Sequence, residues 1–93
     1  MSDATIQLDA LIDRYLGGGQ EFMTFWSDFM DLWNSADLSD SEVVAYDDAY
    51  EVVYMGSPGS ISGNDQAFGL LSEDEVKARL RGFRIRHSGV TPA

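Results

Sequence analysis

The segment from Gln20 to Asn34 constrains the fold of this chain more than any other part of its sequence. Its apolar side chains recur every three or four residues and fall on one side of a helical wheel: Phe22, Phe25, Trp26, Phe29, Met30, Leu32 and Trp33. Polar residues fill the other side: Glu21, Thr24, Ser27, Asp28 and Asp31. This spacing predicts an amphipathic helix whose wide aromatic face other elements must cover. We expect Trp26, Phe29 and Trp33 to lie mainly in the core.

A second helix is predicted over residues 5–16, immediately before this segment. Its apolar residues again have helical spacing: Leu8, Leu11, Ile12 and Tyr15. The pattern stops at the run Gly17-Gly18-Gly19. Because each glycine costs a helix about 1 kcal/mol relative to alanine, the run predicts a short turn between two antiparallel neighbouring helices.

Two capping boxes mark the starts of two further helices, which we predict over 40–54 and 73–85. The first box is Ser39-Asp40-Ser41-Glu42 and the second is Ser72-Glu73-Asp74-Glu75. In each box a serine stands three residues before a glutamate, which lets the two residues satisfy each other's backbone N–H groups. Behind the first box, Val43, Tyr46, Tyr50, Val53 and Tyr54 make an apolar stripe at helical spacing. Behind the second, the residues expected to face inward are Val76, Leu80 and Phe83.

The connection from Met55 to Leu71 is rich in glycine and serine, and we expect it to be a long loop and the least ordered internal segment. Residues 87–93 are expected to form a disordered tail. The prediction is therefore one domain over 1–86, of the all-α class: an antiparallel four-helix bundle with a long loop before the last helix.

The charges of the chain are separated along its length. Sixteen acidic residues lie within 1–75 against one base, Arg14, and the net charge is −10. From residue 76 onward there is no acid, but there are six basic or titratable residues: Lys77, Arg79, Arg81, Arg84, Arg86 and His87. So acidic a surface repels nucleic acid and anionic membranes and attracts cationic proteins. We therefore expect a basic protein as the partner, with neither nucleic acid nor membrane binding.

Few residues are suited to catalysis or to metal binding. The chain has no cysteine, and its single histidine, His87, lies in the predicted tail. Asp9 and Asp13, like Asp47 and Glu51, stand one helical turn apart, but the Glu-x-x-His pairs of carboxylate metal bundles are missing. We expect no enzyme activity, no cofactor and no metal. The absence of a long apolar segment and of a signal-peptide pattern favours a cytoplasmic location.

The predicted third helix carries the strongest candidate for a binding surface. On a helical wheel Asp40, Asp47 and Glu51 fall in a narrow arc with Asp48 beside them, and Tyr50 and Tyr54 border the arc. We name these six residues the acidic stripe. Asp47 and Glu51 repel each other at a cost of about 0.2–0.5 kcal/mol. The stripe is either an ordinary solvated face or a surface that accepts Lys and Arg from a partner, and the total charge favours the second interpretation.

The order of these patterns resembles that of the colicin D-type immunity proteins, within the self-protective colicin-like immunity family. The likeness covers about residues 6–83 and includes Leu11-Ile12-Asp13-Arg14-Tyr15-Leu16, Gln20-Glu21-Phe22, Phe25-Trp26, Leu32-Trp33 and Leu71-Ser72-Glu73-Asp74-Glu75-Val76. The resemblance implies a four-helix bundle that binds the basic tRNase domain of a toxin and blocks its active site with acidic side chains.

The sequence therefore favours a monomeric acidic immunity or inhibitor protein. Two alternatives remain open. A phage-type mimic of nucleic acid that inhibits a defence protein would space its acids like phosphates on one face. A structural helical bundle would form a homodimer through its Trp and Tyr face.

Overall fold

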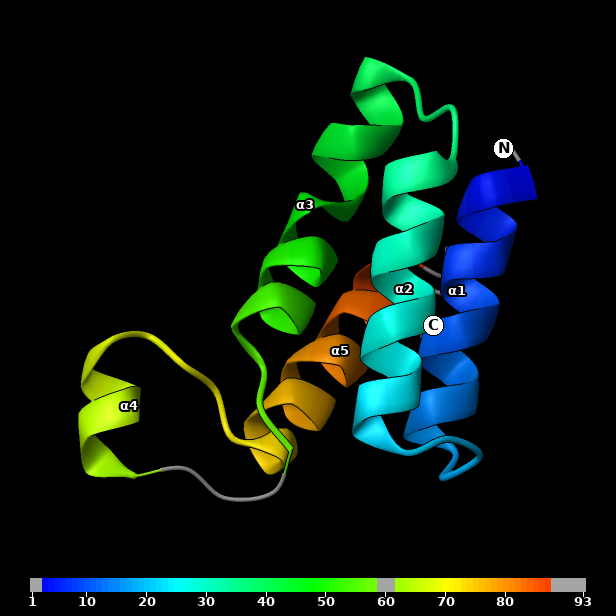
Figure 1. The fold of residues 1–93 in the computed structure, drawn as a ribbon. Coiled ribbons are helices and arrows are strands. Elements are labelled where there is room, and N and C mark those ends of the chain that lie inside the picture. The colour runs from blue at the N-terminus through cyan, green and yellow to red at the C-terminus, as the bar shows by residue number, and fades with distance from the viewer. Residues whose placement is uncertain (1–2, 59–61, 88–93) are drawn as a thin grey trace.

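The computed structural model describes residues 3–58 and 62–87, and this part of the chain folds into five helices without a β-strand (Figure 1). They are α1 (Asp3–Leu16), α2 (Phe22–Ser35), α3 (Asp40–Met55), α4 (Gly63–Ala67) and α5 (Glu73–His87). The predicted all-α class is confirmed, and the four long helices begin and end within a few residues of their predicted bounds.

The glycine run after α1 forms the predicted short turn. The N–H groups of Gly17 and Gly19 donate to the carbonyls of Asp13 and Arg14, each at 2.9 Å. Gly18 has a φ of +83°, which favours glycine. The chain then reverses, so that α1 and α2 lie side by side (Figure 1).

The cap of α3 forms as predicted, whereas that of α5 forms in part. Ser39 Oγ accepts from the N–H of Glu42 at 3.2 Å, and the Glu42 carboxylate accepts from the N–H of Ser39 at 3.0 Å. At α5, Ser72 Oγ accepts from the N–H of Glu75 at 3.3 Å. The Glu75 carboxylate pairs instead with Arg79 at 3.0 Å, one turn further along the helix.

One hydrophobic core joins α1, α2, α3 and α5. Its buried members are Leu8, Ile12, Tyr15, Phe22, Phe25, Phe29, Met30, Tyr46, Ala49, Val53, Val76, Leu80 and Phe83. Phe29 is fully buried, as predicted, but Trp26 and Trp33 are only partly buried at the margin of the core. Indole rings on the edges of so wide an aromatic face cannot all be covered by two neighbouring helices.

Helices α3 and α5 run in opposite directions along each other. Gly56, at the end of α3, lies against Val76 near the start of α5. Tyr46, in the first half of α3, makes an edge contact with Phe83 in the second half of α5, with ring centroids 5.2 Å apart. Both helices are inclined to the α1–α2 pair in Figure 1, and a regular antiparallel bundle of all four helices stays a prediction.

The connection between α3 and α5 is more structured than predicted. It contains α4, where the Ser62 hydroxyl accepts from the N–H of Asp65 at 3.2 Å and starts a single turn of helix that needs no apolar stripe. Its ends are joined because the Leu71 N–H donates to the Met55 carbonyl at 2.8 Å and the Ser57 N–H donates to the Leu71 carbonyl at 2.9 Å. The expectation of a loop throughout 55–71 was therefore wrong, although 59–61 lie outside the described residues.

The predicted start of the tail also needs correction. Helix α5 includes His87, whereas the prediction ended the domain at residue 86. The rest of the predicted tail, 88–93, lies outside the described residues.

Candidate protein-interaction surface

Helix α3 presents the acidic stripe because its opposite face is held in the core. Tyr46, Ala49 and Val53 are buried, and their spacing fixes the rotation of the helix. All four acids of the stripe are exposed: Asp40, Asp47, Asp48 and Glu51. Within 3–58 and 62–87, none of these acids pairs with a base. The sequence therefore predicted the exposure of these carboxylates correctly, and no internal ion pair neutralises them in the described residues.

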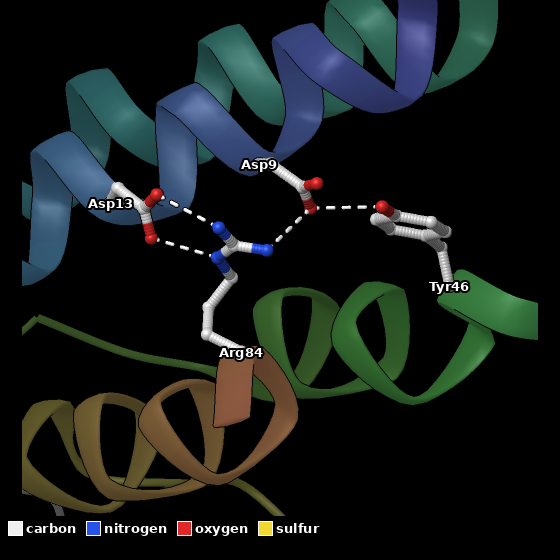
Figure 2. Close-up of polar contacts among 4 residues, drawn as sticks. All are labelled: Asp9, Asp13, Tyr46 and Arg84. Atoms are coloured by element: carbon white, nitrogen blue, oxygen red, sulfur yellow. Dashed lines mark hydrogen bonds and ion pairs between the residues drawn. The ribbon is translucent and has the colours of Figure 1, made fainter. Parts of the chain in front are cut away.

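The reason lies in the way the bases of α5 are used. Arg84 reaches from α5 to α1 and lies between two carboxylates one turn apart (Figure 2). Its Nε and Nη2 donate to the two Asp13 oxygens at 2.8 and 3.0 Å, and its Nη1 is 3.1 Å from Asp9 Oδ1. The Tyr46 hydroxyl donates to the same Asp9 oxygen at 2.9 Å. We call these four residues the Arg84 clasp, which ties α1, α3 and α5 together.

Two further bases of α5 pair with acids of its own first turn. Lys77 Nζ is 3.9 Å from the Glu73 carboxylate and 5.4 Å from the centre of the Tyr15 ring. Arg79 pairs with Glu75 at 3.0 Å. In the folded chain the bases Lys77, Arg79 and Arg84 of α5 therefore pair with acids of α1 and of α5 itself. The four acids of the acidic stripe on α3, like Asp28 and Asp31 of α2, form no ion pair within the described residues.

The two tyrosines of the stripe have different surroundings. Tyr50 is half-buried and stacks on Trp33 of α2, with ring centroids 4.7 Å apart and planes 22° from parallel. Tyr54 stacks on Tyr50 at 6.0 Å and is 59% exposed. Tyr50 therefore joins α2 to α3, while Tyr54 offers an aromatic surface to a partner.

The acids of the stripe also divide. Asp48 and Glu51 line a groove of about 720 Å³ between α3, α4 and α5, whereas Asp40 and Asp47 do not. The other residues that line this groove are Val52, Met55, Gln66, Gly69, Leu70, Leu71, Ala78, Arg79, Gly82, Phe83 and Arg86. Sequence reasoning missed the contributions of α4 and α5. The isolated Gly82 within α5 was the available signal, since such a glycine usually has a packing or functional reason.

Two buried phenols act as hydrogen-bond donors between helices. Burial and the hydrogen bond to Asp9 raise the pKa of Tyr46 to about 12. Burial, followed by the 2.8 Å hydrogen bond to Glu73, raises the pKa of Tyr15 above its usual range. Both hydroxyls keep their protons at neutral pH and serve to hold α1 against α3 and α5.

The carboxylate pair on α1 that we weighed as a metal site binds a guanidinium instead. Asp9 and Asp13 both contact Arg84. Among the described residues, no cluster of three or more His, Cys, Asp or Glu side chains is placed to hold a metal ion. The described helices also include none with both the length and the hydrophobicity needed to cross a membrane.

Comparison with known proteins adds no relative to this picture. The chain matches no family model, no curated protein and no solved structure. The likeness to colicin D-type immunity proteins accordingly depends on the helix-boundary and core residues of the sequence alone.

Proposed function

We propose that this chain is an acidic immunity or inhibitor protein that acts as a monomer in the cytoplasm and binds a basic nuclease domain, of the tRNase kind, through the acidic stripe of α3. The observation that carries the proposal is the set of four exposed carboxylates on α3, none of which forms an ion pair with a base in the described structure. A cationic partner would supply the missing counter-charges.

The aromatic neighbours of these acids support a protein partner. Aromatic side chains are enriched at protein interfaces, and anchors work best when they are already fixed before binding. Tyr54 is exposed, and its ring is supported by Tyr50 and, through it, by Trp33. An exposed tyrosine that is supported by stacked rings and lies beside carboxylates suits a partner surface that carries Arg and Lys. Guanidinium groups also stack on aromatic rings.

The proposal is tested with a purified tRNA-cleaving toxin domain of the colicin D class. The double variant Asp47→Lys/Glu51→Lys should bind this domain more weakly and protect tRNA less than the wild type, while its helical circular dichroism spectrum stays unchanged. The double substitution exchanges one like-charge pair at positions 47 and 51 for another and turns the repulsion between positions 48 and 51 into an attraction, so the fold should be no weaker. Rim charges act mainly on association, so the wild-type association rate should fall steeply with salt and that of the variant less steeply.

A matched control distinguishes the stripe from net charge. Asp28→Lys/Asp31→Lys on α2 makes the same change in total charge at two other exposed acids. If both double variants lose affinity equally, the stripe is not the binding site. If the wild-type protein neither binds nor inhibits the domain, the assignment to tRNase immunity is wrong.

A further inference from the structure

The groove between α3, α4 and α5 has walls of opposite charge that do not meet. Asp48 and Glu51 line the α3 side, and Arg79 and Arg86 line the α5 side. No ion pair crosses the groove within the described residues. Arg79 is held by Glu75 of its own helix, and Arg86 has no acidic partner in the part of the chain described. Asp48 and Glu51 line the same groove as Arg86, yet neither pairs with it. The groove therefore has room for an occupant between these charges.

Apolar side chains also line this groove. They are Val52 and Met55 of α3, with Leu70 and Leu71 after α4. Its volume of about 720 Å³ lies within the range of 300–1,000 Å³ that is typical of ligand sites. An occupant that fits therefore has an apolar centre, a cationic group toward α3 and an anionic group toward α5.

Gly82 keeps the groove open. A glycine inside a helix lowers the stability of that helix, so we expect a packing or functional reason for Gly82. A Cβ on Gly82 would meet only the Arg86 Nη1 atom, at 3.3 Å, and no atom of another helix within 4 Å. Close helix packing therefore does not require this glycine. The missing side chain instead enlarges the groove beside Arg86.

We propose that this groove binds a short peptide segment of the protein partner, with apolar residues flanked by one base and one acid. The inference extends the proposed function, because Glu51 belongs to both the acidic stripe and the groove, so a protein bound to the stripe is placed to insert a segment. The choice of a peptide follows from charge complementarity. A groove with one acidic and one basic wall favours a segment that carries both a base and an acid over a segment whose charges all have the same sign.

Synthetic peptides test the groove without any toxin. The probe is acetyl-Lys-Leu-Phe-Leu-Glu-amide, and its controls carry Lys, Glu or Gln at both ends. Titrated into the isotopically labelled full chain, the Lys/Glu peptide should shift the amide resonances of residues that line the groove and bind more tightly than the controls. Absence of shifts at the groove with every peptide, or equal affinity for all four, would overturn the proposal. Displacement by equal amounts of free leucine or lysine would also overturn it and assign the groove to small molecules.

Two variants make the test specific. Asp48→Lys/Glu51→Lys turns both walls basic and should reverse the preference, so that the Glu/Glu peptide binds best and the Lys/Glu peptide loses about tenfold or more in affinity. Asp28→Lys/Asp31→Lys on α2 makes the same change in charge outside both the groove and the acidic stripe, and it should keep the original preference. Gly82→Leu should fill the groove and abolish binding with the helical spectrum intact; unchanged binding by this variant would refute the site. Selective peptide binding alongside failure to inhibit a tRNase would refute the proposed function and leave the groove assigned.

Discussion

Arg84 of α5 donates two hydrogen bonds to the carboxylate of Asp13 on α1, a residue 71 positions earlier in the chain. The Arg84 side chain is 21% exposed and that of its other partner, Asp9, 16% exposed. The Asp13 side chain is 56% exposed, and its two-point recognition by the guanidinium fixes the geometry of the contact as well as adding stability. The clasp therefore sets how α5 crosses α1, and through Tyr46 it also sets the position of α3.

Arg84→Ala should lower the free energy of unfolding by about 2 kcal/mol, because hydrogen bonds to charged groups are lost and Asp9 and Asp13 are left repelling each other. Urea denaturation at low salt measures the change. Arg81→Ala, at an exposed position of the same helix, is the control and should change stability little. A double-mutant cycle with Asp13→Ala that shows no coupling between the two residues would contradict the role of the clasp.

Phe29→Ala should cost about 3–5 kcal/mol, since the ring is fully buried and its removal leaves a cavity. This cost is a large part of the free energy of unfolding, which is typically about 5–15 kcal/mol for a native protein. The urea midpoint should fall sharply. Met23→Ala, at a position of α2 that is 54% exposed, provides the comparison. Similar midpoints for the two variants would show that the aromatic face of α2 is not the centre of the core.

Tyr46→Phe should reduce the loss of stability in alkali. The pKa of Tyr46 is raised by burial and by Asp9 from 10.0 to about 12, so the folded state holds this proton more tightly than the unfolded state. Its stabilising contribution is complete below pH 10 and is lost as the pH rises toward 12. At neutral pH the variant should lose about 1 kcal/mol with the hydrogen bond. Urea midpoints measured from neutral to alkaline pH test both effects, and identical pH profiles for the two proteins would contradict the assignment.

Alanine at Gly56 and alanine at Gly82 should change stability in opposite directions. Gly56 has φ −74° and ψ 154°, which any residue adopts, but a Cβ there would lie 2.8 Å from Val76 Cγ2 and 2.9 Å from Phe22 Cζ. Overpacking of this kind costs about 1–3 kcal/mol. At Gly82 the Cβ meets only the mobile tip of Arg86, so Gly82→Ala should gain up to about 1 kcal/mol in helix stability. Thermal unfolding measures both changes: the midpoint temperature should fall for Gly56→Ala and rise for Gly82→Ala.

The wild-type protein should be a monomer in solution. A two-fold dimer through α3 would bring each acidic stripe against its own copy, where like charges oppose association. Light scattering coupled to size exclusion at low and physiological salt measures the mass. A stable dimer at low salt would favour the homodimeric structural bundle over the proposed inhibitor.

The sequence predicted what depends on local spacing. Phe22, Phe25 and Phe29 lie on the buried face of α2, and Ser39 with Glu42 starts α3, because periodicity and capping act over a few residues. Helix α4 was missed because a single turn has no periodicity to read, although Ser62 and Asp65 have the spacing of a helix cap. The partners of Arg84 were not predictable, since many acids of the chain were equally suitable and only the tertiary packing brings Asp9 and Asp13 within reach. The contribution of α5 to the groove beside Asp48 and Glu51 could not be predicted for the same reason, since it also depends on tertiary packing.

The Arg84 clasp also bears on the order in which the molecule can be completed during synthesis. A nascent chain that has reached residue 75 contains all sixteen acids and only one base. Its first helices can pair locally as they leave the ribosome, but Asp9 and Asp13 have to wait for Arg84. Until α5 emerges, the partly made protein is a strongly charged, self-repelling polyanion with the Val76, Leu80 and Phe83 part of its core still missing. The last helix therefore lowers the negative charge of the chain and completes the core in the same step.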